Sequence, residues 1–105
     1  MAARILQGEG AWAWDHALLG WQGNEVELMY HGEPLRLDRL AQRTDSGEWW
    51  VLDYKSTHAP QNDPDLVQQL LHYSDAVRAI YPDAVVKCAF LTGQGKLVAL
   101  PDGGG

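Results

Sequence analysis

The chain has 105 residues, of which 46% are hydrophobic and 21% charged, and its net charge is −6. This composition is typical of one globular domain with a modest core. It excludes a membrane span, which needs ~20 consecutive apolar residues, and the N-terminus lacks the long apolar segment of a secretory signal. The single cysteine, Cys88, excludes an internal disulfide and favours a reducing, intracellular setting. The acidic balance argues against nucleic-acid binding through clustered Lys and Arg.

The first half of the chain predicts a short helix and three strands. Trp14, Leu18 and Trp21 recur at helical spacing, which predicts a short helix within an uncertain segment, residues 1–22. Alternation of apolar and polar residues then predicts strands over residues 24–30, 35–43 and 49–55. The sequences HGEP and TDSGE that separate these strands are typical of turns.

The second half predicts a capped helix and two more strands. Asp63 is a natural N-cap and Pro64 suits the first helical position, so the helix runs to about Tyr81 before Pro82 stops it. The nearly continuous apolar run AVVKCAFL predicts a strand inside the sheet, and KLVAL a short edge strand. The order helix–β–β–β–α–β–β predicts an α/β fold, a mixed sheet with an antiparallel meander followed by a crossover helix.

The hairpin before WWVLDYK predicts a pair of acids. If Asp45 and Ser46 form a two-residue loop, the numbers of facing residues sum to 91, and Asp38 lies opposite Asp53. Carboxylates placed so closely persist if they share a proton or bind a cation. Lys55 would share a face with Asp53 as a fixed positive charge. The alternative is a surface salt bridge between Lys55 and Asp53, of little energy, with Asp38 exposed.

The order of these segments resembles a known family. GEPLRLDRL, then a hairpin, then WWVLDYKST, then a helix with QQLLHY is similar to the RecB-like branch of the PD-(D/E)XK nuclease superfamily. Within that branch it resembles the nuclease modules fused to UvrD/RecB-type DNA helicases. The resemblance spans residues 25–100 and implies a restriction-endonuclease-like core. We therefore expect residues 1–105 to be a single nuclease domain, with its core over residues 24–100 and a frayed tail over residues 101–105.

The resemblance also implies roles for individual residues. Asp38, Asp53 and the backbone carbonyl of Tyr54 match the ligands of Mg²⁺ or Mn²⁺, ions that favour oxygen. Lys55 matches the catalytic lysine. Two residues match the helix motif beside the site, Gln69 and Tyr73. One more residue, at the position where many relatives keep an acid opening the first strand, is a further candidate metal ligand: Glu25.

The implied function is a Mg²⁺- or Mn²⁺-dependent, exonuclease-like deoxyribonuclease. Its implied partners are DNA and a helicase domain of the same polypeptide, acting in DNA repair or recombination in the bacterial cytoplasm, at the nucleoid. Relatives carry a longer helical region with another metal ligand before the first strand, and the spacing of Asp15 and His16 does not support either as its substitute. We therefore expect the chain to be the C-terminal part of a larger protein and to be inactive alone. The alternative is a silent nuclease-fold scaffold or a module that binds DNA or a partner.

Overall fold

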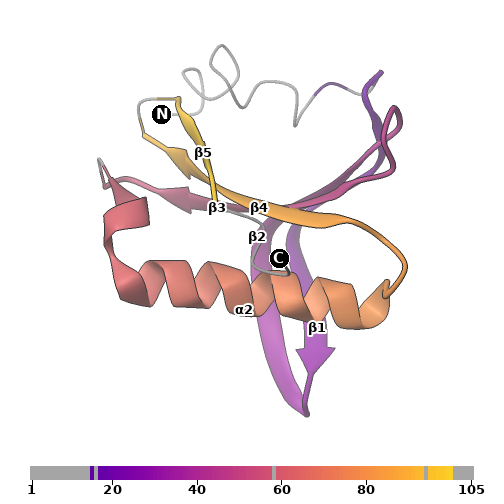
Figure 1. Cartoon of the computed structure of the whole chain (residues 1–105), viewed down its shortest axis with the longest axis horizontal. Coiled ribbons are helices and arrows are strands. Elements are labelled where there is room, and N and C mark those ends of the chain that lie inside the picture. The colour runs from indigo at the N-terminus through magenta and orange to yellow at the C-terminus, as the bar shows by residue number, and fades with distance from the viewer. Residues whose placement is uncertain (1–14, 16, 58, 94, 101–105) are drawn as a thin grey trace.

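The computed structural model describes residues 15, 17–57, 59–93 and 95–100. A five-stranded sheet in the order β1-β2-β3-β4-β5 carries one long helix, α2, against one face (Figure 1). The elements are β1 Leu19–Tyr30, β2 Glu33–Arg43, β3 Trp49–Lys55, the 3-10 turn η2 Pro60–Asn62, α2 Pro64–Ile80, β4 Val86–Thr92 and β5 Leu97–Ala99. None of the helices in these ranges is long and apolar enough to cross a membrane.

The strand pairing confirms the predicted topology. β1, β2 and β3 form an antiparallel meander, and α2 then crosses over so that β4 lies parallel to β3. β5 pairs antiparallel with β4 at the edge of the sheet. The chain is therefore an α/β domain with a mixed sheet, consistent with a restriction-endonuclease-like core. Because β3 and β4 are parallel, their carboxyl ends meet at the same edge of the sheet.

Helix α2 begins and ends as predicted. The side chain of Asp63 accepts a hydrogen bond of 3.0 Å from the N–H of Asp65, so it serves as the N-cap. At the other end the N–H of Tyr81 donates to the carbonyl of Val77. The inner face of the helix packs on a core cluster of fully buried residues that includes Leu70, Val77, Val51 and Phe90. This packing holds α2 across β3 and β4.

The predicted helix within residues 1–22 is wrong where the structure describes it. Leu19 is already the first residue of β1, opposite Arg43, and Trp21 pairs with Gln42. The ring centroids of Trp21 and Trp49 lie 5.7 Å apart. The register shifts between Leu19 and Trp21, and such a bulge breaks the strand alternation of apolar residues. That irregular spacing imitated a helical stripe. Residues 1–14 and 16, and the tail 101–105, lie outside the described ranges.

The sheet divides beside Asp38. β2 continues alongside β1 to the hairpin tip at Tyr30, whereas its pairing with β3 stops at Arg39. Leu37 and Leu40 both belong to the core cluster under α2, although residues three apart on a strand ordinarily face opposite ways. The inward face of β2 therefore changes between them. On β1 the position across from Asp38 is Glu25, with a left-handed φ of 49°.

Candidate functional site

The β2–β3 hairpin has the predicted register with a longer loop. The observed pairs, such as Arg39 with Leu52 and Leu40 with Val51, have numbers that sum to 91. The N–H of Arg43 donates to the carbonyl of Glu48 at 2.9 Å, so residues 44–47 form the loop in place of the expected two residues. A loop that is longer by two residues, one from each strand, leaves the pairing unchanged, and the next facing positions are 38 and 53.

The two strands bring their acids together at this point. Oδ2 of Asp38 accepts a hydrogen bond of 2.9 Å from the backbone N–H of Tyr54. The carboxyl group of Asp38 also lies close enough to that of Asp53 to raise its pKa. Asp38 thereby connects β2 to β3 just beyond the last residue pair of the two strands.

Asp53 is a buried carboxyl, with 4% of its surface exposed. Its Oδ2 accepts no hydrogen bond from any described residue, although Nζ of Lys55 lies 3.2 Å away at ion-pair distance. Burial raises the pKa of Asp53 to about 6, and the nearby carboxyl of Asp38 adds to this, while the charge of Lys55 opposes it. The side chain of Asp53 therefore changes from the neutral acid to the carboxylate near pH 6.

Lys55 connects this buried carboxyl with the surface. It is the last residue of β3, and a quarter of its side chain is exposed. Its carbonyl accepts a hydrogen bond of 3.1 Å from the N–H of Gly93, and it lies beside Thr92 in the parallel ladder. The backbone that carries the ammonium group is thus fixed from the β4 side.

The donor atoms here suit a hard divalent cation. The N–H and C=O of one strand residue point to the same side, so the carbonyl of Tyr54 faces β2, as its N–H does toward Asp38. Two carboxylates and a carbonyl are ligands that Mg²⁺ accepts, with water completing its shell. The buried Oδ2 of Asp53 without a hydrogen bond fits such an ion. Within the described ranges, however, no three His, Cys, Asp or Glu side chains come together as a metal site.

Glu25 does not complete a group of three metal-ligating side chains with the two aspartates in the described ranges. Its side chain is exposed, and its charge acts on Arg36, whose guanidinium pairs with Glu27 at 2.9 Å. The left-handed backbone of Glu25 marks the place where β1 bends beside Asp38. A metal-binding role for Glu25 stays a prediction.

Gln69 and Tyr73 interact with each other on α2. Nε2 of Gln69 donates a hydrogen bond of 2.9 Å to the hydroxyl of Tyr73, whose ring packs against the core cluster. The pair shares a helix face, as predicted from its i, i+4 spacing. The described part of the chain contains no hydrogen bond between this pair and either aspartate. Their role at the site also stays a prediction.

Thr92 belongs to the same edge, and the sequence interpretation did not single it out. It is 1% exposed and is the neighbour of Lys55 across the β3–β4 ladder. A polar residue closing a long apolar strand, directly before Gly93, was the available signal. That signal is weak, because Thr also fits strands on propensity alone.

Two hollows in the described part of the chain lie away from the two aspartates. A hollow of about 220 Å³ is lined by residues such as Trp50, Arg78 and Lys87. A shallower one of about 460 Å³ lies against the stacked rings of Trp49 and Tyr81. Both lie toward the opposite ends of β3 and β4, so they are separate from Asp53 and Lys55.

Comparison with known proteins agrees with this geometry. A family model described as the PD-(D/E)XK nuclease superfamily matches residues 3–98. No match was found among curated proteins. The matched range includes β1 to β4, the long helix and most of β5, and with them Asp38, Asp53 and Lys55.

Proposed function

The chain belongs to the PD-(D/E)XK nuclease superfamily, and from this membership and the site geometry we propose that it is a metal-dependent nuclease module that hydrolyses phosphodiester bonds in DNA. The observation that carries the proposal is the buried carboxyl of Asp53. It lies near a second carboxylate, Asp38, and an ammonium group, Lys55, at the carboxyl end of β3.

In this proposal Asp38, Asp53 and the carbonyl of Tyr54 hold Mg²⁺ or Mn²⁺. Such an ion, when bound, activates water and offsets negative charge on a phosphate. Ionised Asp53 supplies the buried oxygen that accepts no hydrogen bond, and Asp38, held by the backbone N–H of Tyr54, supplies a second carboxylate. Lys55, a quarter exposed, donates hydrogen bonds to the attacking water or to the phosphate oxygens, where charge builds up in the transition state.

We further propose that the module acts beside a DNA helicase, in repair or recombination, and degrades strands from their ends. The charge distribution supports a separate DNA-holding part. The net charge is −6, and ion pairs with acids engage Arg36, Arg43, Lys55, Arg78 and Lys87. A domain with so little free positive charge gains little from phosphate contacts, so a helicase that feeds a strand to the site would overcome its weak affinity.

A silent nuclease-fold scaffold is the second candidate. The observation that favours it is that no third acidic or histidine ligand joins the two aspartates within the described ranges. Calorimetric titration with Mn²⁺ separates the two candidates. Binding that is lost in Asp53→Asn supports the nuclease, whereas no binding by the wild-type chain supports the scaffold.

The direct test of the nuclease is cleavage of end-labelled single-stranded DNA with Mn²⁺ by the full-length protein, because the chain is expected to be inactive alone. We expect Lys55→Gln to lower the rate by about 100-fold or more, in an assay run well below the melting temperature, which loss of the ion pair with Asp53 lowers. Lys87→Gln is the matched control, because it removes the same charge on the neighbouring strand far from Asp53. Equal cleavage by the Lys55→Gln variant and the wild-type chain would reject the assignment. A circular single strand that survives while a linear one is degraded would identify an exonuclease.

A further inference from the structure

Lys96 differs from the other described basic side chains. Arg39 is buried and donates hydrogen bonds to Asn24 and Gln22. The remaining Lys and Arg side chains in the described ranges are in ion pairs with acids. Lys96 is exposed and forms no ion pair there. An acidic domain thus keeps one exposed cation outside its ion pairs in this part of the chain.

The backbone places Lys96 next to Thr92. The β4–β5 pairs, such as Leu91 with Leu97 and Phe90 with Val98, have numbers that sum to 188, so Thr92 and Lys96 face each other. The N–H of Thr92 donates to the carbonyl of Lys96 at 3.0 Å. The N–H of Lys96 in turn donates to Oγ1 of Thr92 at 3.3 Å. Facing residues of an antiparallel pair project to the same side of the sheet.

Thr92 also connects Lys96 with the candidate site. Thr92 is the neighbour of Lys55 in the parallel ladder, so Lys55, Thr92 and Lys96 lie side by side on one face. That face also carries Asp53, two residues before Lys55. With neighbouring strands about 5 Å apart, the backbone of Lys96 lies roughly 10 Å from that of Lys55.

We propose that Lys96 binds a backbone phosphate of the DNA strand that enters the site, beyond the phosphate that is cleaved. This inference rests on the proposed nuclease function and names a substrate-binding residue for it. Phosphate charges on one strand recur about every 3.4 Å of axis, so two ammonium groups on backbones roughly 10 Å apart suit different phosphates of one strand. The contact is independent of base sequence, because it reads only phosphate.

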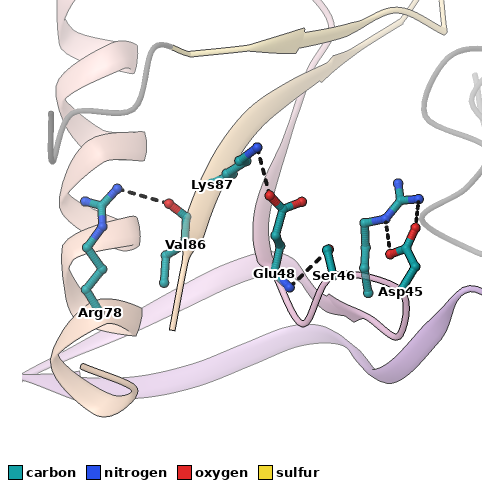
Figure 2. A network of polar contacts seen from close by, with 7 residues as sticks. Asp45, Ser46, Glu48, Arg78, Val86 and Lys87 are labelled. Carbon is teal, nitrogen blue, oxygen red and sulfur yellow. Dashed lines mark hydrogen bonds and ion pairs between the residues drawn. The ribbon is translucent and has the colours of Figure 1, made fainter. Parts of the chain in front are cut away.

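Lys96→Gln tests the proposal, with Lys87→Gln as the matched control. Both remove one positive charge from the β4–β5 region. Lys87 lies near the opposite end of β4, where it pairs with Glu48 at 2.8 Å (Figure 2). The probe is a fluorescein-labelled oligothymidine, titrated by anisotropy over a series of low salt concentrations in EDTA. We expect several-fold weaker binding by the Lys96→Gln variant and a salt-dependence slope smaller by about 0.7, the value for one contact on a single strand.

Cleavage kinetics with Mn²⁺ give a second readout. Lys96→Gln should raise KM and leave kcat nearly unchanged, as for lost uniform binding, while its melting temperature stays that of the wild-type chain. A Lys96→Gln variant that matches Lys87→Gln in affinity and slope overturns the proposal, even if the chain cleaves DNA. A wild-type chain without salt-dependent binding overturns it as well. Binding that depends on Lys96, without any cleavage by the full-length protein, would support the Lys96 contact and reject the nuclease.

Discussion

The carboxylate of Asp38 accepts a 2.9 Å hydrogen bond from the backbone N–H of Tyr54 at the point where β2 and β3 stop pairing. A backbone donor that would otherwise lose its partner is therefore satisfied by an acidic side chain. The cost of leaving such a half-buried donor unpaired is about 1–3 kcal/mol. Asp38 thus has a structural task in addition to its proposed role as a metal ligand.

Two substitutions of Asp38 separate these tasks. Asp38→Asn keeps an oxygen that accepts the hydrogen bond from Tyr54, whereas Asp38→Ala removes it. Both substitutions remove the charge repulsion with Asp53. The difference between their free energies of unfolding therefore reports on the hydrogen bond to Tyr54. We expect Asp38→Ala to be less stable than Asp38→Asn by about 2 kcal/mol in urea unfolding, and Mn²⁺ binding to be lost in both. Equal stability of the two variants would contradict the structural role.

The pKa of Asp53 predicts a stability that depends on pH. Its pKa is about 6 in the folded chain against 3.8 for an ordinary aspartate, so ionisation of this group disfavours the folded state. The penalty is absent below about pH 3.8, grows as the pH rises toward 6 and stays constant above it. At 1.36 kcal/mol per unit of pKa, it amounts to about 3 kcal/mol.

Asp53→Asn should therefore be more stable than the wild-type chain at about pH 8 in EDTA, by up to this amount. The gap should close toward pH 4, and added Mn²⁺ should narrow it at pH 8, because only the wild-type chain gains binding energy. Thermal melts across this pH range measure it. An Asp53→Asn variant that is less stable at pH 8, or a gap that does not change with pH, would refute the raised pKa.

Gly47 lies in the β2–β3 loop, which fixes the strand register that places Asp38 opposite Asp53. Its φ is 73°, and a Cβ at this position would meet nothing within 4 Å, so a substitution costs backbone strain alone. We expect Gly47→Ala to destabilise the domain by about 1 kcal/mol. Gly47→Asn should recover part of the loss, because Asn tolerates this conformation. Chemical unfolding of the two variants measures the effect, and a Gly47→Ala domain as stable as the wild type would argue against the observed loop.

Tyr73 tests the proposed helix motif. Tyr73→Phe removes the hydroxyl that accepts the hydrogen bond from Gln69 and keeps the ring in the core. If this pair contacts the substrate, cleavage should fall by at least tenfold with unchanged stability and Mn²⁺ affinity. Unaltered cleavage would restrict Tyr73 to a packing role.

Local chemistry explains which elements were predictable. The cap at Asp63, the proline after it and the long apolar run of β4 each specify an element from a few adjacent residues, and the structure confirms them. That positions 38 and 53 face each other was predictable, because in a hairpin the centre of the turn fixes which residues of the two strands are opposite. The hairpin loop was predicted two residues too short. The predicted strand register was still correct, because the two extra loop residues come one from each strand.

The remaining features depend on contacts far apart in the sequence. The bulge between Leu19 and Trp21 imitates helical spacing, and only pairing with β2 shows it to be a strand. The left-handed backbone of Glu25 has no signal in the neighbouring sequence. The same holds for the change, between Leu37 and Leu40, in which side of β2 faces the core. The role proposed for Lys96 follows from the ion pairs that other Lys and Arg side chains make in the described part of the chain, which the sequence alone does not display.

The central claim is that Asp38 and Asp53 share one divalent ion. Anomalous diffraction from crystals of the chain grown with Mn²⁺ tests it most directly. The account predicts a single manganese peak within coordination distance of both carboxylates and of the Tyr54 carbonyl. Well-ordered crystals without a peak there, or a peak that contacts only one of the two aspartates, would contradict it.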